Sequence, residues 1–143
     1  MRRYLVVANQ TLFTKQLEDK LGACLAAGPC RFHVLVPATH PRDHLVWTEG
    51  KDRAIAHRRL SQALDRLRTI GAEAEGEVGD ASPFEAIADV LRRHETYDEI
   101  IISTHPPGVS RWLGQDLPHR AMRAFAVPIT HVVAETRTLK TAS

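Results

Sequence analysis

The chain has 143 residues, of which 43% are hydrophobic and 25% are charged, a composition typical of one compact globular domain. The formal net charge is only +2, and basic doublets such as Arg58-Arg59 lie among acidic residues, so we expect solvated helix faces and no nucleic-acid partner. No apolar run approaches the roughly 20 residues of a membrane-spanning helix, and the apolar stretch Tyr4–Ala8 is too short for a signal peptide. These features predict a cytoplasmic protein with no membrane partner.

The two cysteines do not indicate a metal or redox site. Cys24 and Cys30 form no C-x-x-C pair and have no clustered partners in the sequence. Cys24 shares a helical stripe with Leu17 and Leu21, which predicts a small core residue. We therefore expect no metal site.

Apolar runs and amphipathic segments alternate from the start of the chain. The run Arg3–Ala8 (RYLVVA) predicts a buried strand, and the run Arg31–Pro37 (RFHVLVP) predicts a second one. Between them, Gly28-Pro29 marks the end of a helix. The apolar stripe of that helix consists of Phe13, Leu17, Leu21, Cys24 and Leu25.

A polar connection, a helix and a weak strand are expected next. Ala38–Arg53 holds Pro41, Gly50 and mixed charges, which predicts a loop, and its Trp47 is a candidate lid residue. Ala72–Val78 is rich in glutamate, so it suits the edge of a sheet better than its centre. The helix between them ends at Gly71, and its stripe consists of Ala56, Leu60, Ala63, Leu64, Leu67 and Ile70.

The last part of the chain contains signals for two more helices and two more strands. Ser82-Pro83 has the pattern of a helix start, with Ser82 as N-cap and Glu85 reaching back towards it. Glu99–Ser103 (EIIIS) is the most continuous β-branched run and is expected mid-sheet, buried on both faces. Pro128–Ala134 (PITHVVA) predicts the last strand. The helical stripes consist of Phe84, Ile87, Ala88 and Leu91, and of Ala121, Met122, Ala124 and Phe125.

Strands and helices therefore alternate through a single α/β domain. Right-handed crossovers make this a five-stranded parallel, doubly wound sheet with helices on both faces. In such sheets a ligand crevice lies beyond the carboxyl ends of the strands, where the winding direction reverses. The polar loops Asn9–Thr11, after the first strand, and Ser103–Ser110, after the fourth, are the candidates to form it.

These stretches resemble the universal stress protein family from Tyr4 to about Val133. The segment "YLVVANQT" resembles the family's opening strand, "GVSRWLGQDLPHR" its frequent "GLSRLLLGSVAER", and "VPITHVV" its closing strand. The resemblance implies the strand order 3-2-1-4-5, one domain over residues 1–135 and a polar tail over residues 136–143. It also implies an adenine nucleotide as the only candidate cofactor, and a homodimer formed through the last strand, Pro128–Ala134.

The family's nucleotide-binding residues are only partly present. Asn9 stands where the family has the Asp that contacts adenine, and Ile102 and His105 replace the two glycines of its Gly-x-x-Gly. Gln115-Asp116 replaces the Gly-Ser/Thr pair that follows. Gly108 and Ser110-Arg111 are kept, but they lie outside the core phosphate signature.

These replacements should exclude a polyphosphate. A β-branched residue such as Ile102 cannot cheaply adopt the positive φ of a phosphate loop. Pro106 and Pro107 have no N–H to donate to a phosphate. Asp116 is expected to cap the following helix, so an arriving phosphate meets a like charge at a cost of about 1 kcal/mol or more. The sequence predicts that the triphosphate site is lost or rebuilt.

The candidate crevice can be understood in two ways. Each polar residue taken alone can be a cap or turn residue, whereas a functional role requires Ser103, Thr104, Ser110 and Arg111 to converge, with Arg111 able to hold a carboxylate or phosphate. The full candidate set is Ala8, Asn9, Val36, Ser103, Thr104, His105, Gly108, Ser110, Arg111, Gln115 and Asp116.

Three functions remain open from the sequence. The first is a non-enzymatic regulatory or interaction module whose nucleotide site is lost or altered. The second is an adenine nucleotide binder, for ATP or AMP, that uses modified contacts through Asn9 and Arg111. The third is a small hydrolase or phosphotransferase using His105 or His119, but no nucleophile has an obvious activating partner, so no catalytic residue is assigned.

Overall fold

The computed structural model describes residues 1–9, 11–38, 49–93, 96–106 and 116–134. Strands and helices alternate through these ranges, as the sequence predicts. In chain order the elements are β1 (Arg2–Val7), α1 (Lys15–Ala27), β2 (Cys30–Pro37), α2 (Glu49–Thr69), β3 (Glu73–Gly79), α3 (Pro83–Arg93), β4 (Glu99–Thr104), α4 (Asp116–Ala124) and β5 (Ile129–Val133).

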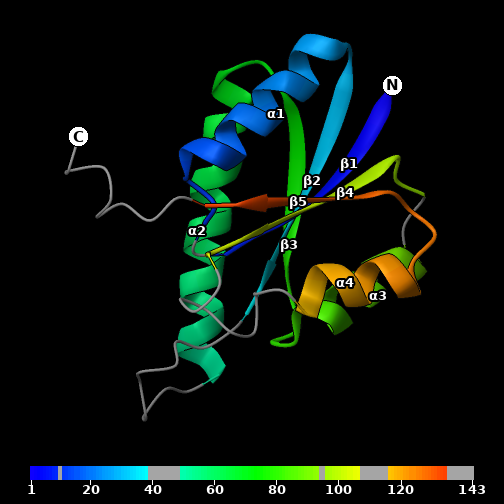
Figure 1. The fold of residues 1–143 in the computed structure, drawn as a ribbon. Helices are drawn as coiled ribbons and strands as arrows, with labels where there is room; N and C mark the ends of the chain where they lie inside the picture. The colour runs from blue at the N-terminus through cyan, green and yellow to red at the C-terminus, as the bar shows by residue number, and fades with distance from the viewer. Residues whose placement is uncertain (10, 39–48, 94–95, 107–115, 135–143) are drawn as a thin grey trace, which may run out of the picture.

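The described strands form one five-stranded parallel sheet in the order β3-β2-β1-β4-β5 (Figure 1). This order and the single α/β domain confirm the predicted fold class. β1 pairs with β2 on one side and with β4 on the other, so the direction of winding reverses at β1. The carboxyl ends of β1 and β4 therefore meet at the switch point where ligand crevices form in such sheets.

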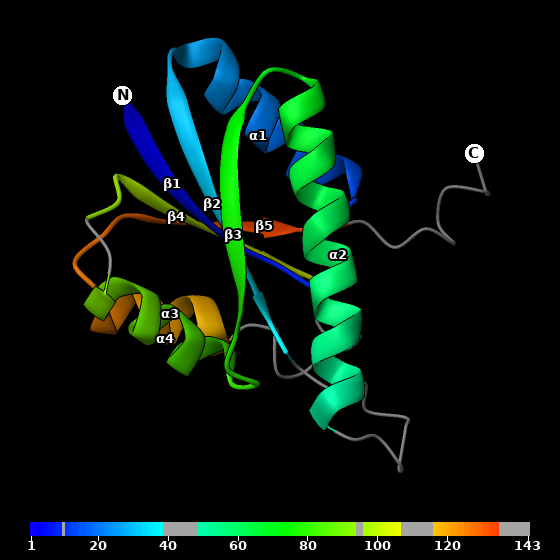
Figure 2. The same cartoon turned by 180° about the vertical axis from the view of Figure 1, so that it is seen from behind.

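Helices cover both faces of the sheet, and alternate residues of the strands point to opposite faces (Figures 1 and 2). Tyr4 and Val6 belong to the core beneath α1 and α2, whereas Leu5 and Val7 belong to the core beneath α3 and α4. Consecutive residues of β4 are likewise divided, and Ile100, Ile101 and Ile102 are all fully buried. The prediction that this run lies mid-sheet, buried on both faces, is confirmed.

The glutamate-rich strand β3 lies at one edge of the sheet, as its composition predicts. Its carboxylates find partners on the neighbouring strand: Glu73 pairs with Arg31 at 2.9 Å, and Glu77 with His33 Nε2 at 2.9 Å. Burial alone would raise the pKa of Glu77, but hydrogen bonds from Arg93 and His33 lower it below the usual value. The Glu73–Arg31 ion pair and the Glu77–His33 hydrogen bond between the strands thus offset the weak strand propensity of these glutamates.

The helix start predicted at Ser82 is confirmed, because the backbone N–H of Glu85 donates to Ser82 Oγ at 3.4 Å. Cys24 is a buried core residue, also as predicted. Among the described residues, no helix combines the length and the apolar character that crossing a membrane requires.

The prediction of a loop over Ala38–Arg53 is wrong at its C-terminal end, because α2 already begins at Glu49. In the first turns of α2 the side chains of Lys51, Arg53 and Ile55 are not buried, so this part of the helix carries no buried apolar stripe. Residues 39–48 of the expected loop, with Trp47, lie outside the described residues.

Some residues assigned to buried stripes are exposed. Phe13 and Ile70 are 38% and 60% exposed, because α1 begins only at Lys15 and α2 ends at Thr69, so neither residue follows the helical periodicity. Met122 and Ala124 are exposed on α4. In α3 the stripe is shifted, and the fully buried residues are Pro83, Ala86, Ile87 and Val90, while Phe84, Ala88 and Leu91 are half-buried.

Gly76 on β3 lies close to both β2 and α2. A Cβ atom at this position would collide with the Val34 carbonyl oxygen and would lie 2.7 Å from Leu60 Cδ1. The collision with main-chain atoms cannot be relieved by a side-chain rotation. Only glycine therefore allows β3 to pair with β2 beneath α2 at this register.

Replacing this glycine should destabilise the fold, whereas replacing an unconstrained glycine should not. We expect Gly76→Ala to lower the free energy of unfolding by about 1–3 kcal/mol because of overpacking. Gly22→Ala is the matched control: nothing lies within 4 Å of a Cβ there, and in helix α1 alanine should add up to about 1 kcal/mol. Urea unfolding of both variants checks this, and a Gly76→Ala variant as stable as the wild type would contradict it.

Candidate functional site

The carboxyl ends of β1 and β2 bring three of the predicted site residues together. Ala8 and Val36 are fully buried and belong to the core beneath α1 and α2, and the N–H of Ala8 donates to the Leu35 carbonyl at 3.2 Å. Asn9 follows directly and is 2% exposed. A polar amide is therefore held in a buried position at the switch point of the sheet.

Both ends of the Asn9 side chain are hydrogen-bonded within the protein. Nδ2 donates to the carbonyl of Pro37, the last residue of β2, at 2.7 Å. Oδ1 accepts a hydrogen bond from Nη1 of Arg59, which lies on α2. Asn9 thus ties the end of β1 to β2 and to α2.

Arg59 is a site residue that the sequence reading missed. The doublet Arg58-Arg59 was expected on a solvated face, but only Arg58 is exposed, and Arg59 is half-buried against Asn9. Burial, and then the charge of Arg58, lower the pKa of Arg59, although a guanidinium stays protonated at neutral pH. The structure therefore places a fixed positive charge beside the switch point.

A second bridge joins the β1 connection to β4. The hydroxyl of Thr11, which is 1% exposed, donates to the Ser103 carbonyl at 3.2 Å. Ser103 is fully buried, and among the described residues its own Oγ has no hydrogen-bond partner. A buried polar atom without a partner is unusual in proteins. Because Ser103 is 0% exposed, its hydroxyl meets a ligand or a water molecule only if the side chains around it move.

The structure does not bring the hydroxyls of Ser103 and Thr104 together. The two residues are adjacent on β4, so they point to opposite faces of the sheet. Thr104 instead hydrogen-bonds His131 of β5, with Oγ1 and Nε2 2.7 Å apart. The sequence reading missed His131, because nothing in the chain near residue 104 indicates this partner.

Two histidines near the end of β4 are held in the neutral form. Burial lowers the pKa of His105, which directly follows β4. Burial, and then the charge of His119 on α4, lower the pKa of His131. These rings are therefore uncharged at neutral pH and do not provide an anion with a cationic partner.

The remaining predicted site residues belong to the connection between β4 and α4 and to the start of α4. Gly108, Ser110, Arg111 and Gln115 lie outside the described residues. Asp116 begins α4, as predicted, but its side chain lies outside the described part. Within the described ranges, no group of three or more His, Cys, Asp or Glu side chains could hold a metal ion.

Solved structures with a similar fold include universal stress proteins. The chain is 10% identical to a universal stress protein family protein from Arabidopsis thaliana with AMP bound, with a TM-score of 0.68 over 96% of this chain and 95% of that one. The chain is 16% identical to the universal stress protein from Archaeoglobus fulgidus, with a TM-score of 0.61 over 92% of this chain and 93% of that one. It is 17% identical to a universal stress protein in complex with cAMP, with a TM-score of 0.53 over 94% of this chain and 98% of that one.

Compared by sequence, the chain matches no protein-family model and no curated protein. At the identities of these solved structures, the likeness shows the fold alone.

Acidification should destabilise the protein through His131. Its pKa is lower in the folded chain than in the unfolded chain, so the unfolded chain takes up the proton first. The contribution of His131 to the free energy of unfolding is therefore fully present above the ordinary histidine pKa of about 6.5, and it is lost as the pH falls below that value. We expect His131→Gln to flatten the decline in unfolding free energy between about pH 7.5 and 5.5.

The matched control is His57→Gln, because His57 is exposed on α2 and should leave the wild-type pH dependence intact. Urea unfolding at several pH values provides the measurement. Parallel curves for wild type and His131→Gln would contradict the assignment of this ring as a half-buried neutral group.

Proposed function

We propose that this chain, which has the fold of the universal stress proteins, is a non-enzymatic regulatory or interaction module whose nucleotide site is altered. The observation that carries the proposal is the state of Asn9. It stands where the resemblance places the adenine-contacting Asp, and its amide is already bonded to Pro37 and Arg59. An adenine base would have to compete with these internal bonds.

The energetic argument concerns the Pro37 carbonyl. If Asn9 turned to read a base, this carbonyl would lose the donor that lies 2.7 Å away. A buried acceptor left without a partner costs about 1–3 kcal/mol. That cost must be subtracted from any adenine contact, so base recognition by Asn9 is weak.

The phosphate side of the crevice is altered as well. Ile102, at the position of a family glycine, is fully buried and belongs to the core beneath α3 and α4. A core side chain here supports the view that the phosphate loop is rebuilt. Because α4 begins at Asp116, a negative residue stands at a helix N-terminus, a position that otherwise favours an anion.

The contact between Thr104 and His131 does not argue for catalysis. A hydroxyl and an imidazole at this distance resemble an activated nucleophile and its base. However, Thr104 is 1% exposed, so its hydroxyl does not reach a substrate. We interpret the pair as a structural link between β4 and β5.

An adenine nucleotide binder with modified contacts is the second candidate. It is favoured by the half-buried positive charge of Arg59 and by the unpartnered hydroxyl of Ser103. Two solved structures of the same fold contain AMP and cAMP. In this case Arg59 would release Asn9 and bind the ligand's phosphate.

Calorimetric titration with AMP, cAMP, ADP and ATP separates the two candidates. The leading proposal predicts no saturable heat with any of them at millimolar concentration. The alternative predicts that AMP binds and that Arg59→Ala weakens it about tenfold or more, the value of one charge-assisted hydrogen bond. Arg58→Ala is the matched control, because Arg58 is exposed. Micromolar binding of ATP to the wild type would refute the leading proposal.

We also propose a homodimer through β5. β5 lies at the sheet edge opposite β3, its residues are only half-buried, and Val133 is 41% exposed. An apolar edge strand of this kind readily pairs with a second copy.

Light scattering after size exclusion should give twice the chain mass of 16.0 kDa. Val133→Lys should shift the protein to the monomer, because a charge on an edge strand opposes pairing. Ala126→Lys, at an exposed position before β5, is the control and should remain dimeric. A wild-type monomer at high concentration would overturn the dimer proposal.

A further inference from the structure

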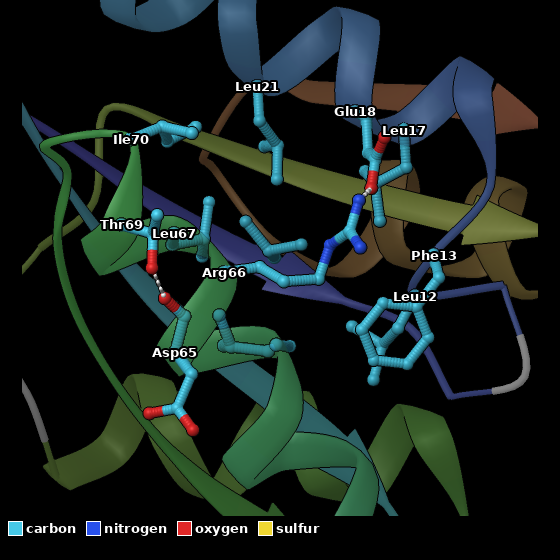
Figure 3. A pocket seen from close by; sticks show the side chains of 13 residues that line it. Leu12, Phe13, Leu17, Glu18, Leu21, Asp65, Arg66, Leu67, Thr69 and Ile70 are labelled. Carbon is cyan, nitrogen blue, oxygen red and sulfur yellow. Dashed lines mark hydrogen bonds and ion pairs between the residues drawn. The ribbon is translucent and has the colours of Figure 1, made fainter.

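A pocket of about 420 Å³ lies between α1 and α2 (Figure 3). Its floor is the sheet, at the buried residues Val6 and Val34, and its walls come from Leu17 and Leu21 on α1 and from Ala63 and Leu67 on α2. These six side chains are aliphatic and contribute no hydrogen-bonding group.

The pocket opens to the surface, and its volume lies within the range of small-molecule sites. Protein interiors are close-packed and contain few voids larger than a water molecule. Pockets that hold small molecules measure roughly 300–1,000 Å³ and are lined mainly by apolar side chains. The apolar walls of this pocket offer ordered water few hydrogen-bond partners, so the pocket is better suited to an apolar ligand.

One ion pair spans the mouth of the pocket. Arg66 on α2 reaches across to Glu18 on α1, and its guanidinium lies 5.6 Å from the centre of the Phe13 ring (Figure 3). Both side chains of the pair are at least two-fifths exposed. An exposed pair contributes only about 0–1 kcal/mol, so opening the mouth costs little.

The charges at the mouth indicate what the pocket binds. Arg66 is neutralised by Glu18, and the carboxylate of Asp65 points away from Arg66 (Figure 3). Asp65 is the lining charge outside this pair, and its carboxylate is directed away from α1, so it does not face a ligand that lies between the two helices (Figure 3). The exposed Phe13 and Ile70 extend the apolar wall to the surface.

We propose that the pocket between α1 and α2 binds an uncharged, mainly apolar small molecule, which enters past the Glu18–Arg66 pair. None of the residues that line it belongs to the crevice at Asn9, Arg59 and Ser103. This site is therefore independent of the proposed function and stands whether or not a nucleotide binds.

The neutral dye N-phenyl-1-naphthylamine is a suitable probe, because its fluorescence rises in apolar surroundings. We expect saturable binding with one dye per wild-type chain. Ala63→Trp fills the pocket and should weaken binding at least about tenfold. Gln62→Trp adds the same ring at the exposed neighbouring position of α2 and should leave the affinity unchanged.

Two further measurements keep the test decisive if Ala63→Trp does not fold. Leu21→Trp fills the pocket from α1 and should also weaken binding. In the wild type, nuclear Overhauser contacts should join the dye to the methyl groups of Leu21 and Leu67. Absence of saturable binding, equal affinity of the Gln62→Trp and pocket-filling variants, or dye contacts elsewhere would each overturn the proposal.

Discussion

The burial of β1 on both faces and along both edges is the constraint on which the rest of the structure depends. Tyr4, Leu5, Val6 and Val7 are each at most 4% exposed, and they alternate between two separate cores. Both neighbours, β2 and β4, run parallel to β1 and can only be reached by crossover connections. The two faces receive their helices for this reason, and the end of β1 becomes the point where the winding reverses.

At that point most polar side chains bond to other parts of the same chain. Asn9 forms hydrogen bonds to β2 and α2, and Thr11 forms one to β4. The connection between β1 and α1 is therefore attached to three other elements. A ligand site in the same place needs groups that are free to turn outward. The unpartnered hydroxyl of Ser103 is the exception among these residues. Structural support and ligand recognition therefore compete for the same few polar atoms, and most of these atoms form hydrogen bonds within the protein.

The two faces of the sheet are packed differently. Beneath α3 and α4 the core is closed at its margin by Phe84 and Phe125, whose rings stack with centroids 5.2 Å apart. Beneath α1 and α2 the margin is held by the charged pair of Glu18 and Arg66, and the wall includes the small side chain of Ala63. Long charged side chains span a gap without filling it, and the hollow between these helices remains as a consequence.

Local patterns in the sequence determined the element order, the buried run EIIIS, the cap at Ser82 and the edge position of β3, because each depends on residues a few positions apart. The helix boundary at Glu49 was missed, since the first turns of α2 bury no apolar face. Only the tertiary structure decided which polar atoms meet. Arg59 reaches Asn9 across 50 residues and His131 reaches Thr104 across 27. Such pairings follow from how elements cross in space, and periodicity along the chain carries no information about the crossing.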